Sequence, residues 1–154
     1  MPITDTSLSA DLVVKGGKDD KELPIVVVSD RMISERNGDK ITFLGNVVAK
    51  RGNMTVYSDV LEIHNDEKEG KDKIIARDNV RIEQEEKYAV GQKAIFYEEE
   101  QKIVLTGNPK AWENNDMITG TEMIFFINRD ETIVNGSSES KVKAIFYPKE
   151  KGER

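Results

Sequence analysis

The chain has 154 residues, 37% of them hydrophobic and 34% charged, and its 23 basic and 29 acidic side chains give a net charge of −6. This length is typical of one domain, whose core requires that apolar residues be confined to one face of each element. The acidic balance argues against nucleic-acid binding and simple electrostatic docking on anionic lipid, and the lack of cysteine excludes thiol catalysis and cysteine-based metal sites.

Residues 1–23 are predicted to form a flexible N-terminal arm, since they are mostly polar and contain only Leu12–Val14 as a short apolar run. The apolar stretch Ile25–Val28 is far shorter than the ~20 residues that a membrane-spanning helix needs. No run resembles a secretory signal, and the artificial-looking start Met1-Pro2 leads us to expect that one was removed. The ordered domain is predicted to begin at Pro24, because proline is tolerated at the first position of a strand.

From Pro24 onward the chain repeats one unit, in which an alternating strand is broken by small residues and then resumes. One set of breaks recurs at spacings of 33, 29 and 29 residues: Gly45-Asn46, Asp78-Asn79, Gly107-Asn108 and the degenerate Gly136-Ser137. A second set recurs at spacings of 29, 33 and 29 residues: Ser29-Asp30, Ser58-Asp59, Gly91-Gln92 and Gly120-Thr121. Two sets of breaks with the same period indicate a repeat of hairpins whose arms are bent at each break.

The parity of the apolar positions assigns the two faces of these strands. Residues at even distances from each Gly-Asn break are apolar, and the apolar phase shifts across each Ser-Asp break, which indicates a bulge or a corner. No stretch has a helical period over three turns, so we predict about 16 short antiparallel strands in stacked hairpin layers. The predicted inner face comprises Val27, Met32, Ile41, Phe43, Val47, Val56, Leu61, Ile63, Ile74, Val80, Ile82, Phe96, Ile103, Leu105, Ile118, Met123, Phe125 and Val134.

The sequence predicts no catalytic residue, no metal site and no cofactor. Asp30 and Asp59 recur at matching repeat positions, where an aspartate after serine caps a bulge by accepting hydrogen bonds from backbone amides. Acid catalysis needs two carboxylates in different environments, whereas a repeat supplies similar ones. His64 is the only histidine and lies beside an acidic loop, so it offers neither a histidine metal site nor a catalytic base.

An apolar interior of medium and small side chains either packs dry or accepts a lipid. Each methylene transferred from water contributes about 0.8 kcal/mol, so an acyl chain of about a dozen methylenes would gain on the order of 10 kcal/mol before the cost of association. An open layered sheet also leaves an edge strand at each end, and head-to-tail pairing of such edges does not close. The predicted edge contacts are Ile25, Val26, Val28, Val142, Ala144 and Phe146.

The order and spacing of these motifs resemble the LptA (OstA-like) family of periplasmic lipopolysaccharide transport proteins. The resemblance covers about residues 24–148 and ends before a charged tail, 149–154. The motifs that carry it are Pro24–Asp30, Phe43–Val47, Arg51–Met54, Ser58-Asp59, Val104–Asn108, Ile118–Gly120 and Val142–Pro148.

The resemblance implies an elongated, twisted β-jellyroll that binds the lipid A part of lipopolysaccharide in its groove. It implies a non-enzymatic periplasmic bridge, with an inner-membrane transport component of the same fold at one end and the N-terminal domain of the outer-membrane translocon at the other. The alternatives are that the chain is one of those same-fold partners, or a β scaffold that polymerises through its edges without cargo. A polysaccharide-cleaving repeat protein is disfavoured by the lack of a dissimilar carboxylate pair.

Overall fold

The computed structural model describes residues 23–66 and 71–148, and this part of the chain is an all-β fold of twelve antiparallel strands. The predicted arm up to Glu22, the tail 149–154 and residues 67–70 of the acidic loop lie outside the described residues. The elements are β1 (Val26–Val28), β2 (Arg31–Glu35), the 3₁₀ turn η2 (Arg36–Gly38), β3 (Lys40–Arg51), β4 (Met54–Asp66), β5 (Lys71–Gln84), β6 (Lys87–Tyr97), β7 (Lys102–Thr106), β8 (Lys110–Glu113), β9 (Asp116–Thr119), β10 (Glu122–Phe126), β11 (Glu131–Asn135) and β12 (Lys143–Ile145).

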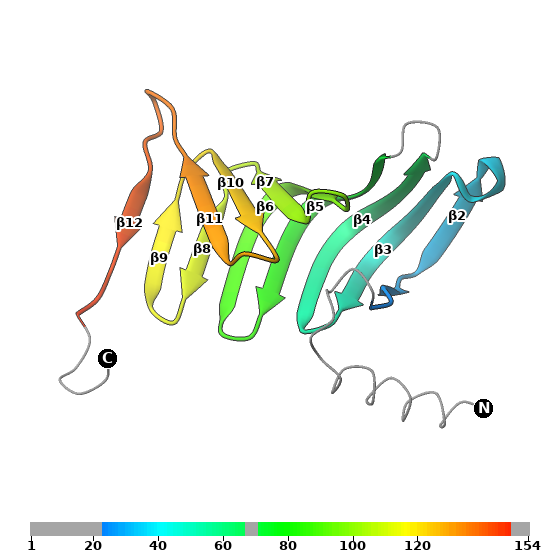
Figure 1. Ribbon diagram of the computed structural model, residues 1–154, viewed down its shortest axis with the longest axis horizontal. Helices are drawn as coiled ribbons and strands as arrows, with labels where there is room; N and C mark the ends of the chain where they lie inside the picture. Colours follow the sequence, from blue (N-terminus) through cyan, green and yellow to red (C-terminus); the bar gives the residue numbers. More distant parts are fainter. Residues whose placement is uncertain (1–22, 67–70, 149–154) are drawn as a thin grey trace.

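The strands follow one another along the long axis of the molecule, with the N-terminal strands at one end and β12 at the other (Figure 1). β3 to β6 are long and continuous, whereas β1 and β2 pair separately with the two halves of β3. In the same way β7 and β8 pair with the two halves of β6, and β9 and β10 continue the sheet beside them. Twelve strands stand in place of the predicted sixteen because four of the bent strands pass through their bends without a break.

The Gly-Asn breaks, predicted as bends, are β-bulges. The register shifts between β3 and β4 at Gly45-Asn46 and between β5 and β6 at Asp78-Asn79. Both residues of each break have positive φ, and Gly107-Asn108 repeats this geometry between β7 and β8. Glycine, asparagine and aspartate are the residues that adopt this conformation most readily, which explains the recurring composition of the breaks.

The recurring aspartates have a different role from the one predicted. The Asp30 carboxylate accepts a hydrogen bond from the side-chain amide of Asn46 at 3.0 Å, and Asp59 accepts one from Asn79 at 2.8 Å. The serine hydroxyls make the backbone contacts instead, since Ser58 Oγ donates to the carbonyl of Val60 at 2.9 Å. Each carboxylate therefore joins one bulge to the next strand rather than capping its own backbone.

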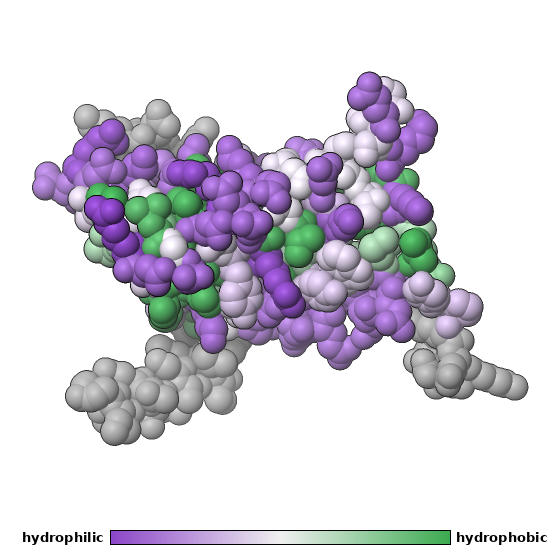
Figure 2. All heavy atoms as spheres, turned by 180° about the vertical axis from the view of Figure 1, so that it is seen from behind, coloured by the Kyte–Doolittle hydropathy of each residue, from purple (hydrophilic) through white to green (hydrophobic). Residues whose placement is uncertain are grey.

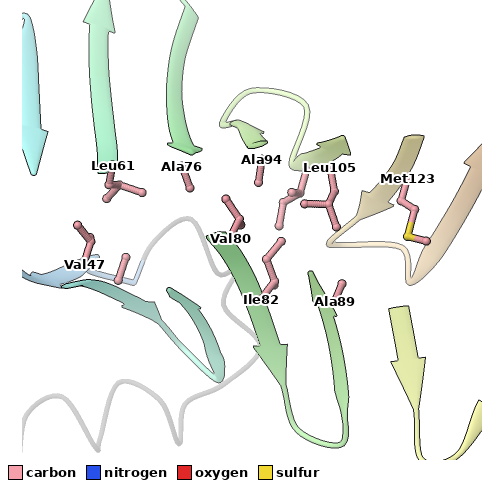
Figure 3. Close-up of a cluster of buried hydrophobic side chains, with 11 residues drawn as sticks. Val47, Leu61, Ala76, Val80, Ile82, Ala89, Ala94, Leu105 and Met123 are labelled. Atoms are coloured by element: carbon pink, nitrogen blue, oxygen red, sulfur yellow. The ribbon is translucent and has the colours of Figure 1, made fainter. Parts of the chain in front are cut away.

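The bends fold the sheet into two facing layers. Layer A contains β2, β7, β10 and β11 with the adjoining halves of β3 to β6, and layer B contains β1, β8, β9 and β12 with the other halves. In Figure 3 Leu61, Ala76 and Leu105 of layer A point towards Val47, Val80 and Ile82 of layer B. These side chains belong to one buried cluster that runs through the molecule. The predicted single apolar interior is thus the space between the layers.

Asp78→Gly is expected to raise the free energy of unfolding by about 0.5 kcal/mol. Asp78 has a φ of 71°, which glycine adopts without the cost that a Cβ brings, although glycine loses more entropy on folding. Gly107→Ala is the matched control and is expected to lower the free energy of unfolding. Its added Cβ would lie 2.5 Å from Cβ of Gln92, at a residue whose φ is 87°. Urea unfolding of both variants checks the prediction, and a loss of stability in Asp78→Gly would contradict it.

Candidate functional site

The interior between the layers holds two adjoining apolar cavities, which together are called the groove below. The first compartment has a volume of about 80 Å³ and the second about 320 Å³, and both are partly open to solvent. Met54, Ile82, Ile103 and Ile127 line both of them and therefore form the boundary between the compartments. The first is also lined by Ile25, Ala49, Lys50, Arg51, Val56, Leu61, Ile74, Ala76, Ala94, Phe96 and Gln101.

The second compartment lies towards the C-terminal end of the sheet and has a more polar lining. Its apolar floor comes from both layers, since Ala89 and Ile118 belong to layer B and Phe125 to layer A. Its remaining lining residues are Gln84, Lys87, Tyr88, Ala111, Trp112, Glu113, Asp116, Phe126, Asp130, Glu131, Thr132 and Phe146. Tyr88 and Trp112 stack with their ring centroids 4.8 Å apart, and because Ala89 and Ala111 are the inward residues of this strand pair, the stack lies on the outer face of layer B.

The structure places nearly all of the predicted inner-face residues in or against the buried cluster between the layers. The fully buried ones are Val47, Leu61, Val80, Ile82, Ile103, Leu105 and Met123. The half-buried ones that pack against them are Val27, Phe43, Val56, Ile74, Phe96, Ile118, Phe125 and Val134. Ile41 and Ile63 are half-buried outside this cluster, and Met32, which pairs with Phe43 at the edge, is 55% exposed.

Several lining residues were not predicted, although position alone could have found some of them. Arg51 lies six residues after Gly45 and so continues the inward parity of Val47 and Ala49. Ile127 continues the inward series of Phe125 by two residues. Gln101 is buried and donates from Nε2 to the carbonyl of Glu98 at 2.8 Å, which no sequence pattern indicated.

Both ends of the sheet present strands with one unpaired side in the described part of the chain. At the N-terminal end β1 and β2 pair only with β3, and Val26 and Val28 are exposed. At the C-terminal end β12 pairs only with β9, and the flanking Phe146 is 67% exposed. Figure 2 shows hydrophobic side chains gathered at the end with the N-terminal strands and a smaller group at the opposite end. Ile25, predicted as an edge contact, lines the first compartment instead of the outer surface.

A network of charged side chains lies on the outer face of layer A, away from the groove. Glu62 accepts hydrogen bonds from His64 Nε2 at 2.9 Å and from Arg77 Nη2 at 2.9 Å. Burial raises the pKa of Glu62, but the hydrogen bonds from His64 and Arg77 and the charges of Arg77 and Lys40 outweigh it and hold this pKa below the ordinary value of 4.5. The ionised Glu62 therefore stabilises the folded state.

Glu62→Gln is expected to lower the free energy of unfolding by about 1 kcal/mol at pH 7. Because the folded-state pKa is depressed, the contribution is complete above pH 4.5 and is lost as the pH falls through the folded value. The difference between variant and wild type should therefore shrink at pH 3. Urea unfolding at both pH values measures it, with Glu139→Gln on the exposed loop after β11 as the control. A difference that persists unchanged at pH 3 would contradict the charge-based explanation.

Neither a metal cluster nor a membrane-spanning helix was found in residues 23–66 and 71–148. No three His, Asp or Glu side chains of this part are grouped so that they could hold a metal ion. No helix in the same residues is both long and apolar enough to cross a membrane.

The chain was compared with known protein families, curated sequences and solved structures. Residues 26–131 match the family described as the LptA/(LptD N-terminal domain) LPS transport protein. No curated sequence matches the chain. Among solved structures, the chain is similar to LptH from Pseudomonas aeruginosa, the LptA homologous periplasmic component of the lipopolysaccharide transport device. That similarity has a TM-score of 0.74 at 16% identity and covers 85% of this chain and 100% of LptH.

Proposed function

Because the chain belongs to the LptA/LptD N-terminal domain family of lipopolysaccharide transport proteins, we propose that it is a non-enzymatic periplasmic bridge that carries lipopolysaccharide with its acyl chains in the groove. The observation that carries this proposal is the groove itself, whose first compartment has a lining that is apolar apart from Lys50, Arg51 and Gln101. Acyl chains gain free energy in such a lining because each methylene leaves water. The sugar and phosphate groups of lipid A would remain at the open side.

The same proposal gives the unpaired edges a role in assembly. A strand with unpaired backbone groups can pair with a strand of another sheet of the same fold. β1 and β2 at one end and β12 at the other would join the chain to the inner-membrane component, to the translocon domain, or head to tail to further copies. Such joining would make the grooves of successive modules continuous.

Photo-crosslinking tests the lipid part of the proposal. A crosslinking residue at Phe96 or Phe125, half-buried in the first and second compartments, is expected to capture lipopolysaccharide in a Gram-negative host. The same residue at Lys93, which is exposed on the outer face of β6 three residues before Phe96, is the control and should capture none. Equal capture at Lys93 would overturn the assignment of the groove as the lipid site.

Sedimentation over a range of protein concentrations tests the assembly part. Wild type is expected to form species larger than a monomer as concentration rises, and the double substitution Val26→Lys with Val28→Lys should prevent this by placing charges on the exposed edge. If the wild type assembles, the double variant does not, and the wild type yields no lipid on extraction, the alternative of a scaffold without cargo is favoured. If neither assembles, the edges do not join copies of this chain.

A further inference from the structure

Arg51 is a charged residue at an inward position of the groove. It is the last residue of β3, and its side chain lines the first compartment while remaining only 15% exposed. Its guanidinium reaches across from layer B to Glu98, which follows β6 in layer A, with Nη2 3.3 Å from Oε1 and Nη1 3.4 Å from Oε2. The guanidinium also lies over the Phe96 ring, 5.2 Å from its centroid. An ion pair thus joins the two layers at the side of the compartment.

The hydrogen-bonding capacity of Arg51 is incompletely used. Charge-assisted bonds between guanidinium and carboxylate are usually about 2.7–2.9 Å long, so both contacts to Glu98 are long. Nε of Arg51 is buried and has no acceptor among the residues that the structure describes. A buried donor without a partner costs free energy, so an acceptor supplied by a ligand would bring a gain that a solvated arginine could not offer.

The charges along the groove favour an anion in the first compartment over the second. Both charged residues that line the first compartment are basic, but Arg51 is the one of inward parity, since Lys50 is exposed at the outward position beside Ala49. In the second compartment Lys87 is the one basic lining residue and is accompanied by four acidic ones, Glu113, Asp116, Asp130 and Glu131. Lys87 is already near Asp130, with Nζ 3.7 Å from Oδ1. The two compartments therefore differ in the charge of the head group that each would accept.

We propose that Arg51 is the anion-binding residue of the groove: it binds the phosphate or carboxylate of an amphiphile whose alkyl chain fills the first compartment. Glu98 accepts the two hydrogen bonds of the guanidinium, and the ligand's anionic oxygens would take its place and reach Nε as well. This assignment deepens the proposed function and rests on it, since it presumes that the compartment receives an alkyl chain. It adds head-group recognition at one end of the groove.

Titration calorimetry with three amphiphiles of equal chain length tests the assignment. Dodecyl phosphate and dodecanoate carry the two anionic heads and separate phosphate from carboxylate, whereas dodecyl maltoside is neutral and reports on the apolar lining alone. Arg51→Gln is expected to weaken the affinity of the anionic ligands by about tenfold and to leave dodecyl maltoside within about twofold. Glu98→Gln should strengthen dodecyl phosphate binding by about threefold, because it removes the competing carboxylate.

Arg77→Gln is the matched control, since it removes the same charge from an arginine–carboxylate ion pair, with Glu62 on the outer face of layer A, and should leave dodecyl phosphate affinity unchanged. Arg51→Lys, which keeps the charge but lacks Nε, should lie between wild type and Arg51→Gln. If Arg51→Gln does not fold, the affinity of Glu98→Gln for dodecyl phosphate tests the anion site instead: a gain supports the site, and no gain contradicts it.

The possible failures are distinguishable. If Arg51→Gln loses affinity equally for anionic and neutral ligands, or loses none, the anion site is contradicted. The proposal that the groove binds lipid would be unaffected by that result. Failure of all three amphiphiles to bind the wild type would overturn the lipid groove, and the anion site with it.

Discussion

Leu105→Ala is expected to lower the free energy of unfolding by about 3 kcal/mol. Leu105 is 0% exposed and lies on β7 between Ala94 on β6 and Met123 on β10. Its side chain also covers Gly91, where an added Cβ would come within 2.8 Å of Leu105 Cδ1. Ala94 and Gly91 are too small to fill the space that Leu105 would leave, so a cavity would persist in the buried cluster. Urea unfolding at neutral pH measures the loss.

Val104→Ala is the control for this prediction, because Val104 is the next residue of the same strand and points to the outer face of layer A. It is half-buried, pairs with Ile95 and Ile124, and should cost less than about 1.5 kcal/mol on truncation. Leu105→Met, which conserves volume, should also cost less than about 1.5 kcal/mol. Equal losses for Leu105→Ala and Val104→Ala would show that the two faces of β7 are equally packed, contrary to the assignment from parity.

The parity that distinguishes these two residues could be read from the sequence because of how a strand is built. Successive side chains of a strand point to opposite faces, so one buried face imposes alternation. The alternation keeps its phase across Gly45-Asn46 and Asp78-Asn79 and shifts at Ser58-Asp59 and Gly91-Gln92, which are also positions marked by composition. The repeat then extended the assignment from one arm to the next. This is why the all-β class, the bends and most of the inner face followed from the residues alone.

Features that depend on where bent strands meet could not be predicted in this way. Whether a strand continues through a bend is one such feature, and pairing does not decide it, since β7 to β10 are paired on both sides like β3 to β6 and yet end at their bends. The degenerate break at Gly136 also differs in structure from the other breaks of its set, which the repeat did not predict. There the chain forms a turn in which Ser137 N donates to the carbonyl of Ser140 at 2.9 Å, and β12 begins only at Lys143.

The groove was predicted as an apolar interior, but its charged residues were not. Because apolar side chains are buried on folding, the sequence pattern places them on the inner face. A charged residue of inward parity is ordinarily expected to lie where the inner face meets solvent. The pairing of Arg51 with Glu98 spans 47 positions in sequence and depends on the facing of the two layers. No local pattern contains that information, so the charge difference between the compartments emerges only from the structure.

Ala76→Phe is expected to weaken the binding of alkyl-chain ligands by at least tenfold. Ala76 is buried on β5, pairs with Leu61 and Ala94, and lines the first compartment, so a phenyl ring there would occupy the space of the chain. Displacing about three methylenes from an apolar site costs about 2.4 kcal/mol, which corresponds to more than a tenfold loss. Calorimetric titration with dodecyl maltoside isolates this effect, because its neutral head group does not depend on Arg51.

The substitution must be distinguished from simple destabilisation, since overpacking a core typically costs about 1–3 kcal/mol. Urea unfolding of Ala76→Phe gives that cost directly, and titration is carried out where the variant is fully folded. Ile75→Phe, at the next residue on the outer face of β5, adds bulk to the same strand without entering the groove, and it should bind dodecyl maltoside like the wild type. If Ala76→Phe also binds like the wild type, the alkyl chain does not occupy the first compartment. The alkyl chain would then lie in the second compartment, whose acidic lining disfavours an anionic head group.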